Sequence, residues 1–260
     1  WRIFFTIPKE EGILSVIFWA VLLIAECVGL LEMAVHFYNM YDYDRVKLHT
    51  PYMKKEDLPE VDVFIPTINE DITLLEKTLY ACKQMEYPDK NKVHIYLCDD
   101  GNRQEVKELA EKMLIYYVTR SEHKDAKAGN LNYALQKSSS PYIAVFDADM
   151  MPKKKFLMRT IPWFSKEQIG FVQTPQNFYY PDLFQYNLYA SDHIPNEQDY
   201  FYKVVQVAKN KSNSVIFGGS NAVLSRKALE ETGGFVTGVV TEDFATGIEI
   251  EKKGYKGIAI

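Results

Sequence analysis

Three acidic clusters are the parts of this sequence best suited to chemistry: Asp99-Asp100-Gly101, Asp147-Ala148-Asp149 and Thr241-Glu242-Asp243. The first two directly follow the apolar runs Val93 to Cys98 and Tyr142 to Phe146, which are typical of buried parallel strands. Ligands of an open α/β sheet bind beyond the carboxyl ends of its strands. We therefore expect these acids to converge on one rim of a sheet.

Asp147 and Asp149 are the strongest candidates for a metal site. Residues i and i+2 of an extended chain project to the same side, so both carboxylates can share one cation with a diphosphate. Carboxylates, phosphate oxygens and water suit Mg²⁺ or Mn²⁺. Lys127 opens a predicted helix with Ala128-Gly129-Asn130, where its ammonium and the free amides could hold a phosphate. The alternatives are an ordinary Asp-x-Asp turn and a solvated lysine.

The ends of the first two strands carry polar groups suited to a nucleoside. Pro66-Thr67-Ile68-Asn69-Glu70 closes the first strand with side chains that can hydrogen-bond a base or ribose, although turns of this composition are common. Asp99 and Asp100 end the second strand, and Gly101 relaxes the backbone for the turn. The alternative for these two acids is a cap on the helix that begins near Arg103.

Glu242 and Asp243 begin another predicted helix. One of these acids could take the proton from an acceptor hydroxyl as it attacks an anomeric carbon. The alternative is a favourable charge at the positive end of the helix dipole. Phe217-Gly218-Gly219-Ser220-Asn221 offers flexible backbone where a sugar must approach closely, or an ordinary tight turn. The aromatic run from Phe178 to Tyr189 fits an interface helix, a sugar-stacking surface or simple packing.

The elements that must position these residues alternate between strand and helix from Pro59 onward. This alternation predicts right-handed crossovers and an α/β fold with a mostly parallel sheet. The expected strands are Val61 to Thr67, Val93 to Cys98, Leu114 to Thr119, Tyr142 to Phe146 and Ile169 to Gln173. The expected helices are Asp71 to Gln84, Arg103 to Met113 and Ala128 to Lys137.

The stretch from Ile13 to Leu31 is apolar apart from Glu26. As a helix it approaches the length needed to cross about 30 Å of hydrocarbon. The favourable insertion free energy of its apolar residues outweighs the free-energy cost of inserting one acid. A buried or interfacial helix is the alternative. An acid inside a spanning helix usually faces other helices, so we expect further transmembrane helices beyond this segment.

The basic residues on the two sides of this stretch predict its orientation. Four follow it and two precede it, an excess that places the later residues in the cytosol. They are Arg45, Lys47, Lys54 and Lys55 after it, and Arg2 and Lys9 before it.

Composition narrows the function classes. A formal net charge of -5 over 260 residues gives no overall basic surface, so we expect no nucleic-acid partner. Cys27, Cys82 and Cys98 form no close pair, which is typical of reduced thiols. The sequence begins at Trp1 and stops at Ile260 as a new strand starts, so we expect an excerpt from a longer polypeptide.

Taken in order, these motifs resemble the processive, membrane-embedded family 2 glycosyltransferases, such as bacterial cellulose synthase. The resemblance covers about the whole stretch after residue 59. It is carried by Val63 to Glu70, Cys98 to Gly101, Lys127 to Asn132, Asp147 to Asp149, Val172 to Pro175, Phe217 to Ser220 and Thr241 to Asp243.

The resemblance implies a GT-A fold and an inverting transfer from a UDP-sugar donor onto a growing β-linked polysaccharide acceptor. In that family Asp243, beside Glu242, would be the general base, and Asp149 with Asp147 would bind the divalent ion and the diphosphate. Lys127 would contact the phosphates. The uridine contacts would come from the ends of the first two strands, at Thr67, Asn69, Glu70, Asp99 and Asp100. The acceptor end would lie by Gln173 and by Phe217, Gly218, Gly219 and Ser220.

The resemblance also implies an organisation. Residues 1–58 would be a membrane helix with a juxtamembrane linker, and residues 59–260 a C-terminally incomplete GT-A domain. The protein would be a multi-pass plasma-membrane protein with a cytoplasmic catalytic domain. It would contact the lipid membrane, and accessory or homo-oligomeric subunits are left open.

Three positions depart from the family pattern. The Gln-x-x-Arg-Trp motif does not follow Asp243, Met150 stands where many cellulose synthases have His, and Gly218 stands where they have Cys. The polymer is therefore open among β-glucans and other hexose polymers. Two further classes remain: a non-processive transferase to a lipid carrier, and a pseudo-transferase that only binds a nucleotide sugar.

Overall fold

The computed structural model describes residues 1–260 with the exception of residues 42, 44–48 and 167. The chain divides into two compact units, Trp1–Val46 and Lys47–Ile260, which we treat separately. Arg45 and Lys47, on which the predicted orientation depends, lie outside the described residues. That prediction therefore stays a prediction.

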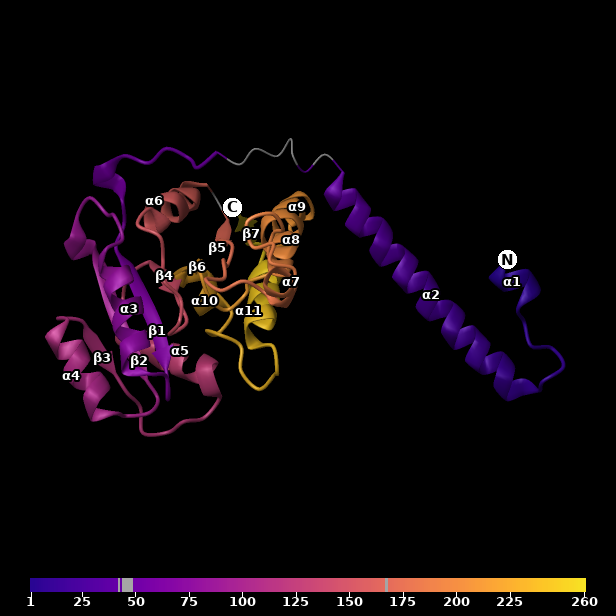
Figure 1. The fold of residues 1–260 in the computed structure, drawn as a ribbon, viewed down its shortest axis with the longest axis horizontal. Helices are drawn as coiled ribbons and strands as arrows, with labels where there is room; N and C mark the ends of the chain where they lie inside the picture. Colours follow the sequence, from indigo (N-terminus) through magenta and orange to yellow (C-terminus); the bar gives the residue numbers. More distant parts are fainter. Residues whose placement is uncertain (42, 44–48, 167) are drawn as a thin grey trace. The chain divides into compact units, whose positions relative to one another are not determined.

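The first unit contains a short helix α1 (Arg2–Phe5) and a long helix α2 (Ile13–Met40) (Figure 1). Helix α2 begins where the sequence predicts, but it runs on past Leu31 to Met40. Among the described helices it is the one that is long and apolar enough to cross a membrane. Glu26 on this helix has a partner within the unit, because Arg2 Nε lies 3.0 and 2.8 Å from its two carboxylate oxygens.

The second unit is built on a seven-stranded sheet in the order β3-β2-β1-β4-β6-β5-β7. Its neighbours pair in parallel except at β6, which is antiparallel to both β4 and β5. The predicted α/β fold with a mostly parallel sheet is confirmed. The strands are β1 (Val61–Thr67), β2 (Val93–Asp99), β3 (Tyr116–Val118), β4 (Tyr142–Val145), β5 (Ile169–Gln173), β6 (Ala222–Ser225) and β7 (Lys256–Ala259).

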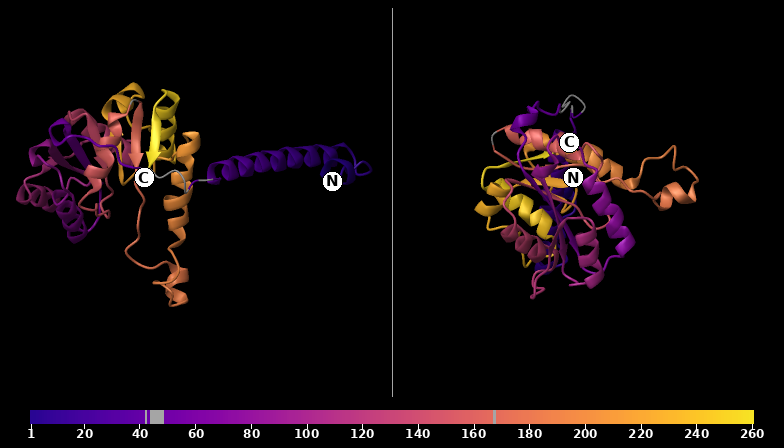
Figure 2. Two further views of the ribbon diagram at one scale, coloured as in Figure 1. Left: turned by 90° about the horizontal axis from the view of Figure 1, so that it is seen from above. Right: turned by 90° about the vertical axis from the view of Figure 1, so that its left-hand side faces the viewer.

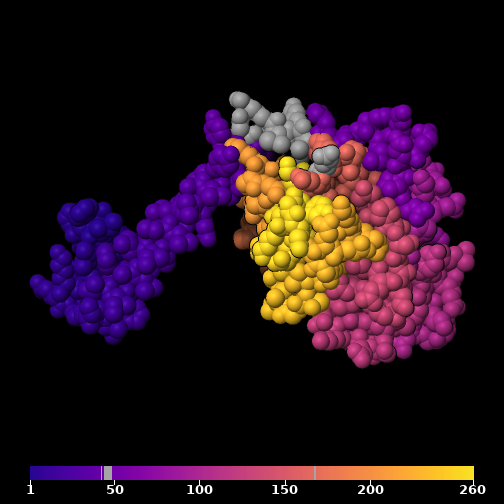
Figure 3. Space-filling model, turned by 180° about the vertical axis from the view of Figure 1, so that it is seen from behind, coloured from indigo at the N-terminus to yellow at the C-terminus, as the bar shows by residue number. Residues whose placement is uncertain are grey.

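Helices cover both faces of this sheet (Figure 1). The α-helices are α3 (Ile72–Lys83), α4 (Gln104–Lys112), α5 (Ala126–Lys137), α6 (Phe156–Thr160), α7 (Leu183–Asn187), α8 (Glu197–Tyr200), α9 (Gln206–Lys209), α10 (Arg226–Glu231) and α11 (Glu242–Lys252). Short 3-10 turns are η2 (Lys55–Asp57), η3 (Lys90–Lys92), η4 (Ile161–Ser165) and η6 (Asn210–Ser212), and η5 (Phe201–Val205) is a π-helix. In the space-filling view from behind, the yellow C-terminal elements lie directly against the pink middle part of the chain (Figure 3).

The predicted helices begin and end for local reasons. Asp71 caps α3, because its carboxylate accepts hydrogen bonds from the amides of Thr73 and Leu74. The face of α3 that carries Leu75, Leu79 and Cys82 is buried, as the apolar spacing predicts.

The core lies on both faces of the central strands. Every residue of β1 is buried. Val63 and Ile65 point into one hydrophobic cluster, and Phe64 points into the cluster on the opposite face. This alternation explains why apolar residues occupy both faces of β1, since both faces are covered by helices.

Between β5 and β6 the chain leaves the sheet as an arm, residues 177–203, drawn in orange (Figure 2). The arm carries α7, α8 and the start of η5, which the sequence does not predict. Its aromatic residues are not packed in a core, because Tyr179 and Tyr180 are 84% and 78% exposed. Simple packing therefore does not explain the aromatic run.

Candidate active site

The carboxyl ends of β1, β2 and β4 meet at one edge of the sheet. Thr67 of β1 pairs in register with Asp99 of β2, and the Asp100 amide donates to the Thr67 carbonyl at 2.9 Å. Strand β4 pairs with β1 on its other side, and Asp147 follows β4 after one intervening residue. The predicted convergence of acids on one rim is present for Asp100 after β2 and Asp147 after β4, and Thr67 at the end of β1 lies between them.

Asp99 lies beneath this rim, not on its surface. It is fully buried, and its carboxylate accepts from the Gly101 amide at 3.0 Å and the Arg103 amide at 2.7 Å. The Tyr117 hydroxyl adds a third hydrogen bond at 3.0 Å. Burial, followed by this bond to Asp99, raises the pKa of Tyr117 to about 12. Asp99 thus behaves as the turn-and-cap residue that the sequence leaves as the alternative.

Glu70 organises the loop that closes β1. Its Oε2 accepts from the Thr67 hydroxyl at 2.6 Å and from the amides of Ile68 and Asn69 at 2.8 and 3.1 Å. Burial acts to raise the pKa of Glu70, but these hydrogen bonds prevail and lower it. Arg103 donates to the Thr67 hydroxyl from the other side at 2.8 Å. Asn69 is exposed above this fixed loop.

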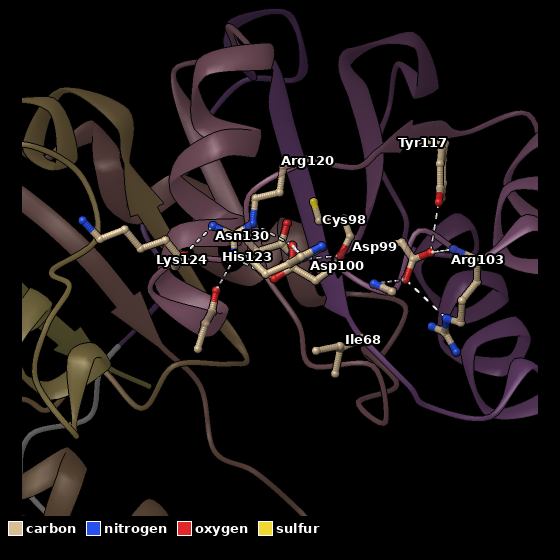
Figure 4. A network of polar contacts seen from close by, with 12 residues as sticks. Ile68, Cys98, Asp99, Asp100, Arg103, Tyr117, Arg120, His123, Lys124 and Asn130 are labelled. Carbon is tan, nitrogen blue, oxygen red and sulfur yellow. Dashed lines mark hydrogen bonds and ion pairs between the residues drawn. The ribbon is translucent and has the colours of Figure 1, made fainter.

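Asp100 is held by a side chain that the sequence analysis missed. Arg120 reaches both of its carboxylate oxygens at 2.7 Å, and each side chain of this pair is less than a tenth exposed (Figure 4). Arg120 also donates to the carbonyls of Lys124 and Ala126 at 2.6 and 2.9 Å. It therefore ties Asp100 to the loop that leads into α5 and Lys127. A lone arginine in a loop carries no motif that would have marked it.

Lys127 joins two other segments at the rim. Its ammonium contacts the Asp147 carboxylate and donates to the Gly219 carbonyl at 3.0 Å. The Asp147 amide in turn donates to the Ser220 hydroxyl at 2.9 Å. Asp149 is exposed at the same turn. The Lys127 and Asp147 motifs, predicted separately, thus form one cluster with the glycine loop.

The loop from Phe217 to Ser220 is fixed from beneath by Gln173. The Gln173 side chain accepts from the Gly218 amide at 2.9 Å and donates to the Ser220 carbonyl at 2.9 Å. Gln173, Phe217 and Ser220 are each at most 1% exposed. Of the residues expected at an acceptor, these three shape the loop, and Gly218 keeps partial exposure.

Asp243 faces this glycine loop from the first turn of α11. Its Oδ1 accepts from the Phe244 amide at 2.7 Å. A Cβ atom at Gly219 would lie 2.7 Å from Asp243 Oδ2, so only glycine permits this approach, and Gly219 has a φ of +72°. A small cavity is lined by Lys127, Gly219, Glu242 and Asp243 together. The third acidic cluster therefore lies beside Lys127, which contacts Asp147 of the second cluster.

Tyr202 is a second residue that the sequence did not mark. Burial, followed by the negative charges of Asp243 and Asp147, raises the pKa of Tyr202. It is one tyrosine among 18 and comes from the foot of the arm, so nothing local distinguishes it.

Comparison with known families identifies this arrangement. The sequence model of "Glycosyl transferase family 2" matches residues 62–233. The chain belongs to glycosyl transferase family 2. The match contains the rim residues from Thr67 to Asp149 and the glycine loop, while Asp243 follows its end.

Relatives in this family include cellulose synthases. The chain is 41% identical over 199 residues to the cellulose synthase catalytic subunit [UDP-forming] of Xanthomonas axonopodis pv. citri (strain 306), a match that covers 76% of the chain and 27% of that protein. It is 36% identical over 260 residues to the cellulose synthase 1 catalytic subunit [UDP-forming] of Komagataeibacter xylinus, covering 98% of the chain and 34% of that protein. The chain thus spans about a third or less of the length of these relatives.

Two solved structures of other enzymes have a fold similar to that of this chain. A mannosyltransferase from Pyrobaculum calidifontis, in complex with GDP-Man and Mn²⁺, has a TM-score of 0.66 at 26% identity, over 90% of this chain and 66% of that one. Glucosyl-3-phosphoglycerate synthase from Mycobacterium tuberculosis, with Mn²⁺, UDP and its product, has a TM-score of 0.52 at 14% identity, over 82% of this chain and 76% of that one. The expected GT-A fold and the family resemblance are confirmed.

Proposed function

We propose that this chain is the catalytic part of a membrane-embedded, inverting glycosyltransferase that polymerises a β-linked, glucan-type polysaccharide from a UDP-sugar and helps to export it. UDP-glucose is the first donor to test, because the relatives are UDP-forming cellulose synthase subunits. One observation carries the proposal. Lys127 contacts both Asp147 and the Gly219 carbonyl, and Gly219 abuts Asp243, so donor-side and acceptor-side groups share one small cavity.

The nucleotide would bind at the ends of β1 and β2. Asp100, held by two hydrogen bonds from Arg120, and the loop from Thr67 through Asn69 to Glu70 offer acceptors and a hydroxyl to uridine. Asp99 is saturated by internal hydrogen bonds and serves this site by positioning its turn. Lys127 would move from Asp147 to the diphosphate, which is the stronger anion.

The donor set at Asp147 and Asp149 fits a divalent cation. Asp149 is exposed, and Asp147 is partly exposed and shares its carboxylate with the mobile ammonium of Lys127. Two carboxylates that leave room for phosphate oxygens and water are typical ligands of Mg²⁺ or Mn²⁺. When bound there, such an ion would neutralise charge on the departing diphosphate.

Asp243 would act as the general base. Its Oδ1 accepts the Phe244 amide, while Oδ2 faces the glycine loop and the cavity. The acceptor oxygen forms a bond to the anomeric carbon as the bond from that carbon to the diphosphate oxygen breaks. The hydroxyl proton passes to the Asp243 carboxylate, and UDP leaves. Attack opposite the leaving group inverts the anomeric centre, which gives a β-linkage from an α-linked donor.

The acceptor end would lie against Gly218 and Gly219, with Tyr202 beside it. Gln173, Phe217 and Ser220 hold this loop in place from below. Glu242, next to the base, lines the same cavity.

The membrane part of the proposal rests on helix α2 and on the relatives. Helix α2 has the length and composition of a spanning helix. The full-length relatives are about three times as long as this chain, since aligned stretches of 260 and 199 residues cover 34% and 27% of them. We place the protein in the plasma membrane as a multi-pass protein, with the catalytic unit in the cytosol and the growing polysaccharide leaving through the membrane.

The test uses membranes that contain the full-length protein. They are incubated with a panel of radiolabelled UDP-sugars and Mg²⁺ or Mn²⁺, and high-molecular-weight product is collected. We expect polymer from one donor, and Asp243→Asn to lower its rate by about 10²- to 10⁴-fold while UDP binding persists. The control is Lys153→Gln, which removes an exposed charge four positions after Asp149. It should leave the rate of polymer synthesis unchanged.

Two outcomes would favour the other classes. Label that appears in an organic-solvent-soluble product would indicate a non-processive transfer to a lipid carrier. UDP binding without turnover of any donor would indicate a nucleotide-sugar sensor. If wild-type membranes bound no UDP, all three function classes would be contradicted.

A further inference from the structure

A second cavity lies in the arm, residues 177–203. It has a volume of about 450 Å³, which lies in the range of small-ligand sites. Its walls come from the two limbs of the arm, Asn177 to Pro181 on one side and Ser191 to Lys203 on the other. None of these residues belongs to the site at Asp147 and Asp243.

Hydrogen bonds join the two limbs of the arm. Gln185 is 7% exposed, and its amide donates to the Ile194 carbonyl at 2.6 Å and accepts from the Asp182 amide at 3.0 Å. The Asp182 carboxylate accepts from the amides of Gln185 and Glu197, both at 2.8 Å. These bonds lower the pKa of Asp182, so the carboxylate stays ionised at neutral pH. The cavity is therefore preformed.

The lining combines aromatic faces with hydrogen-bonding groups. Phe178, Tyr179 and Tyr180 form the aromatic part. The two tyrosine rings pack edge to face, with 5.2 Å between their ring centroids. Asp192 and His193 supply an acceptor carboxylate and an imidazole. Rings that present an apolar face beside polar side chains suit a ligand with both apolar C–H faces and hydroxyls.

The charged residues of the lining do not suit a phosphate or a metal ion. A phosphate would need free cations, but Lys203 in the lining is already paired with Asp199 at 2.7 Å. A divalent cation would need at least two free carboxylates, but Asp199 is already paired with Lys203, so Asp192 is the remaining carboxylate of the lining. A neutral, hydroxyl-rich ligand remains, which is the chemistry of a saccharide.

The cavity is connected to the candidate active site by one helical stretch. Asp199 of α8 and Lys203 of η5 line the cavity, and Gln206, which directly follows η5, accepts from the Ile216 amide at 2.9 Å just before the loop from Phe217 to Ser220. A saccharide that reaches from one site to the other would be continuous with the acceptor. We propose that the arm cavity is a saccharide subsite that holds a segment of the acceptor or product chain. Its link to polymer synthesis rests on the proposed function.

The test measures binding and turnover in the same detergent-solubilised full-length protein. Soluble β-linked gluco-oligosaccharides are titrated by calorimetry, and UDP is titrated as the check on folding and on the donor site. Tyr180→Ala removes an exposed ring of the cavity, and Tyr189→Ala removes an exposed ring of the arm that does not line it. We expect Tyr180→Ala to weaken oligosaccharide binding about tenfold, and Tyr189→Ala to leave it unchanged.

The outcomes separate this proposal from the transferase assignment. Oligosaccharide binding that is lost in Tyr180→Ala but kept in Tyr189→Ala, in protein that binds UDP but turns over no donor, would uphold the cavity and contradict the transferase. Wild-type protein that binds UDP but no oligosaccharide would overturn the cavity alone. Equal losses in both variants, or none in either, would also overturn it, because the ligand would then bind elsewhere.

Discussion

Gly219 joins the donor and acceptor sides of the site through its backbone. Its carbonyl accepts from Lys127, and its α-carbon faces Asp243 Oδ2. A methyl group there would meet that oxygen at 2.7 Å and would also be strained at a φ of +72°. We predict that Gly219→Ala displaces Asp243 and lowers kcat about 100-fold, since a misplacement of about 1 Å costs that much.

Gly233 provides the control for this prediction. Its φ is also positive, at +86°, but a Cβ atom there would meet nothing within 4 Å. Gly233→Ala should therefore stay within about threefold of wild type in a polymer-synthesis assay, a change below about 1 kcal/mol. If both variants were equally active, Gly219 would not position the base.

At the scale of elements, Arg226 links α10 to β1 and to the loop before β4. It donates to buried Asp62 at 2.9 Å and to the carbonyl of Ser140 at 2.6 Å, and Ser140 also donates to Asp62. Arg226→Ala would leave the Asp62 charge without its cation in the core. We predict a loss of about 3 to 5 kcal/mol in the free energy of unfolding, measured by urea denaturation in detergent.

The neighbouring residue Lys227 gives a matched comparison, because it is exposed on the same helix. Lys227→Ala should change the free energy of unfolding by less than about 0.5 kcal/mol. Similar losses for Lys227→Ala and Arg226→Ala would show that helix α10, and not the buried pair, sets the stability.

The contact between α9 and α11 should make stability depend on pH. Burial raises the pKa of Glu251 to about 7, with Lys209 opposing the shift, and Glu251 Oε1 is buried with no hydrogen-bond partner among the described residues. The folded state therefore holds a proton that the unfolded chain releases near pH 4.5. The free energy of unfolding should fall as pH rises from about 4.5 to about 7, and then level off.

Glu251→Gln removes this penalty. We expect it to stabilise the protein at pH 8 by about 1 kcal/mol, because the side chain is partly exposed and solvent screens much of the effect. At pH 4 the variant should match wild type. Glu249→Gln, which alters a surface pair with Lys252, serves as the control in urea titrations at both pH values. A gain that is equal at pH 4 and pH 8 would rule out ionisation as the cause.

At the scale of the molecule, the first unit decides whether the chain enters a membrane. Helix α2 exceeds the hydrocarbon thickness, and its acid Glu26 is paired with Arg2. We predict that Arg2→Ala raises the apparent free energy of insertion of residues 1–60 by about 1 to 2 kcal/mol, because Glu26 would then be unpaired. Glycosylation mapping in microsomes would measure it.

Lys9→Ala is the comparison for this prediction, since Lys9 is exposed and precedes the helix. It should leave insertion nearly unchanged. Unaltered insertion of Arg2→Ala would contradict the prediction, because it would mean that the pair with Glu26 does not contribute to insertion.

Much of the fold could be predicted because it depends on local patterns. Strand β5 spans Ile169–Gln173 and α5 ends at Lys137, both as expected. The spacing of apolar residues and the positions of turn-forming residues can be read directly from the sequence. The rim of acids followed from those strands. The antiparallel strand β6 and the arm were missed, since their positions depend on contacts with distant parts of the chain.

The sequence by itself determined the family, the sheet and the set of carboxylates. Only the tertiary structure decided which of them face the site. Asp99 and Asp100 are identical in type, yet neighbouring side chains leave the backbone on opposite sides, so one is sealed beneath the rim and the other is held by Arg120. Lys127 contacts Asp147, 20 positions later in the chain, and the Gly219 carbonyl, 92 positions later. Such meetings depend on how separate elements pack, which no local pattern encodes.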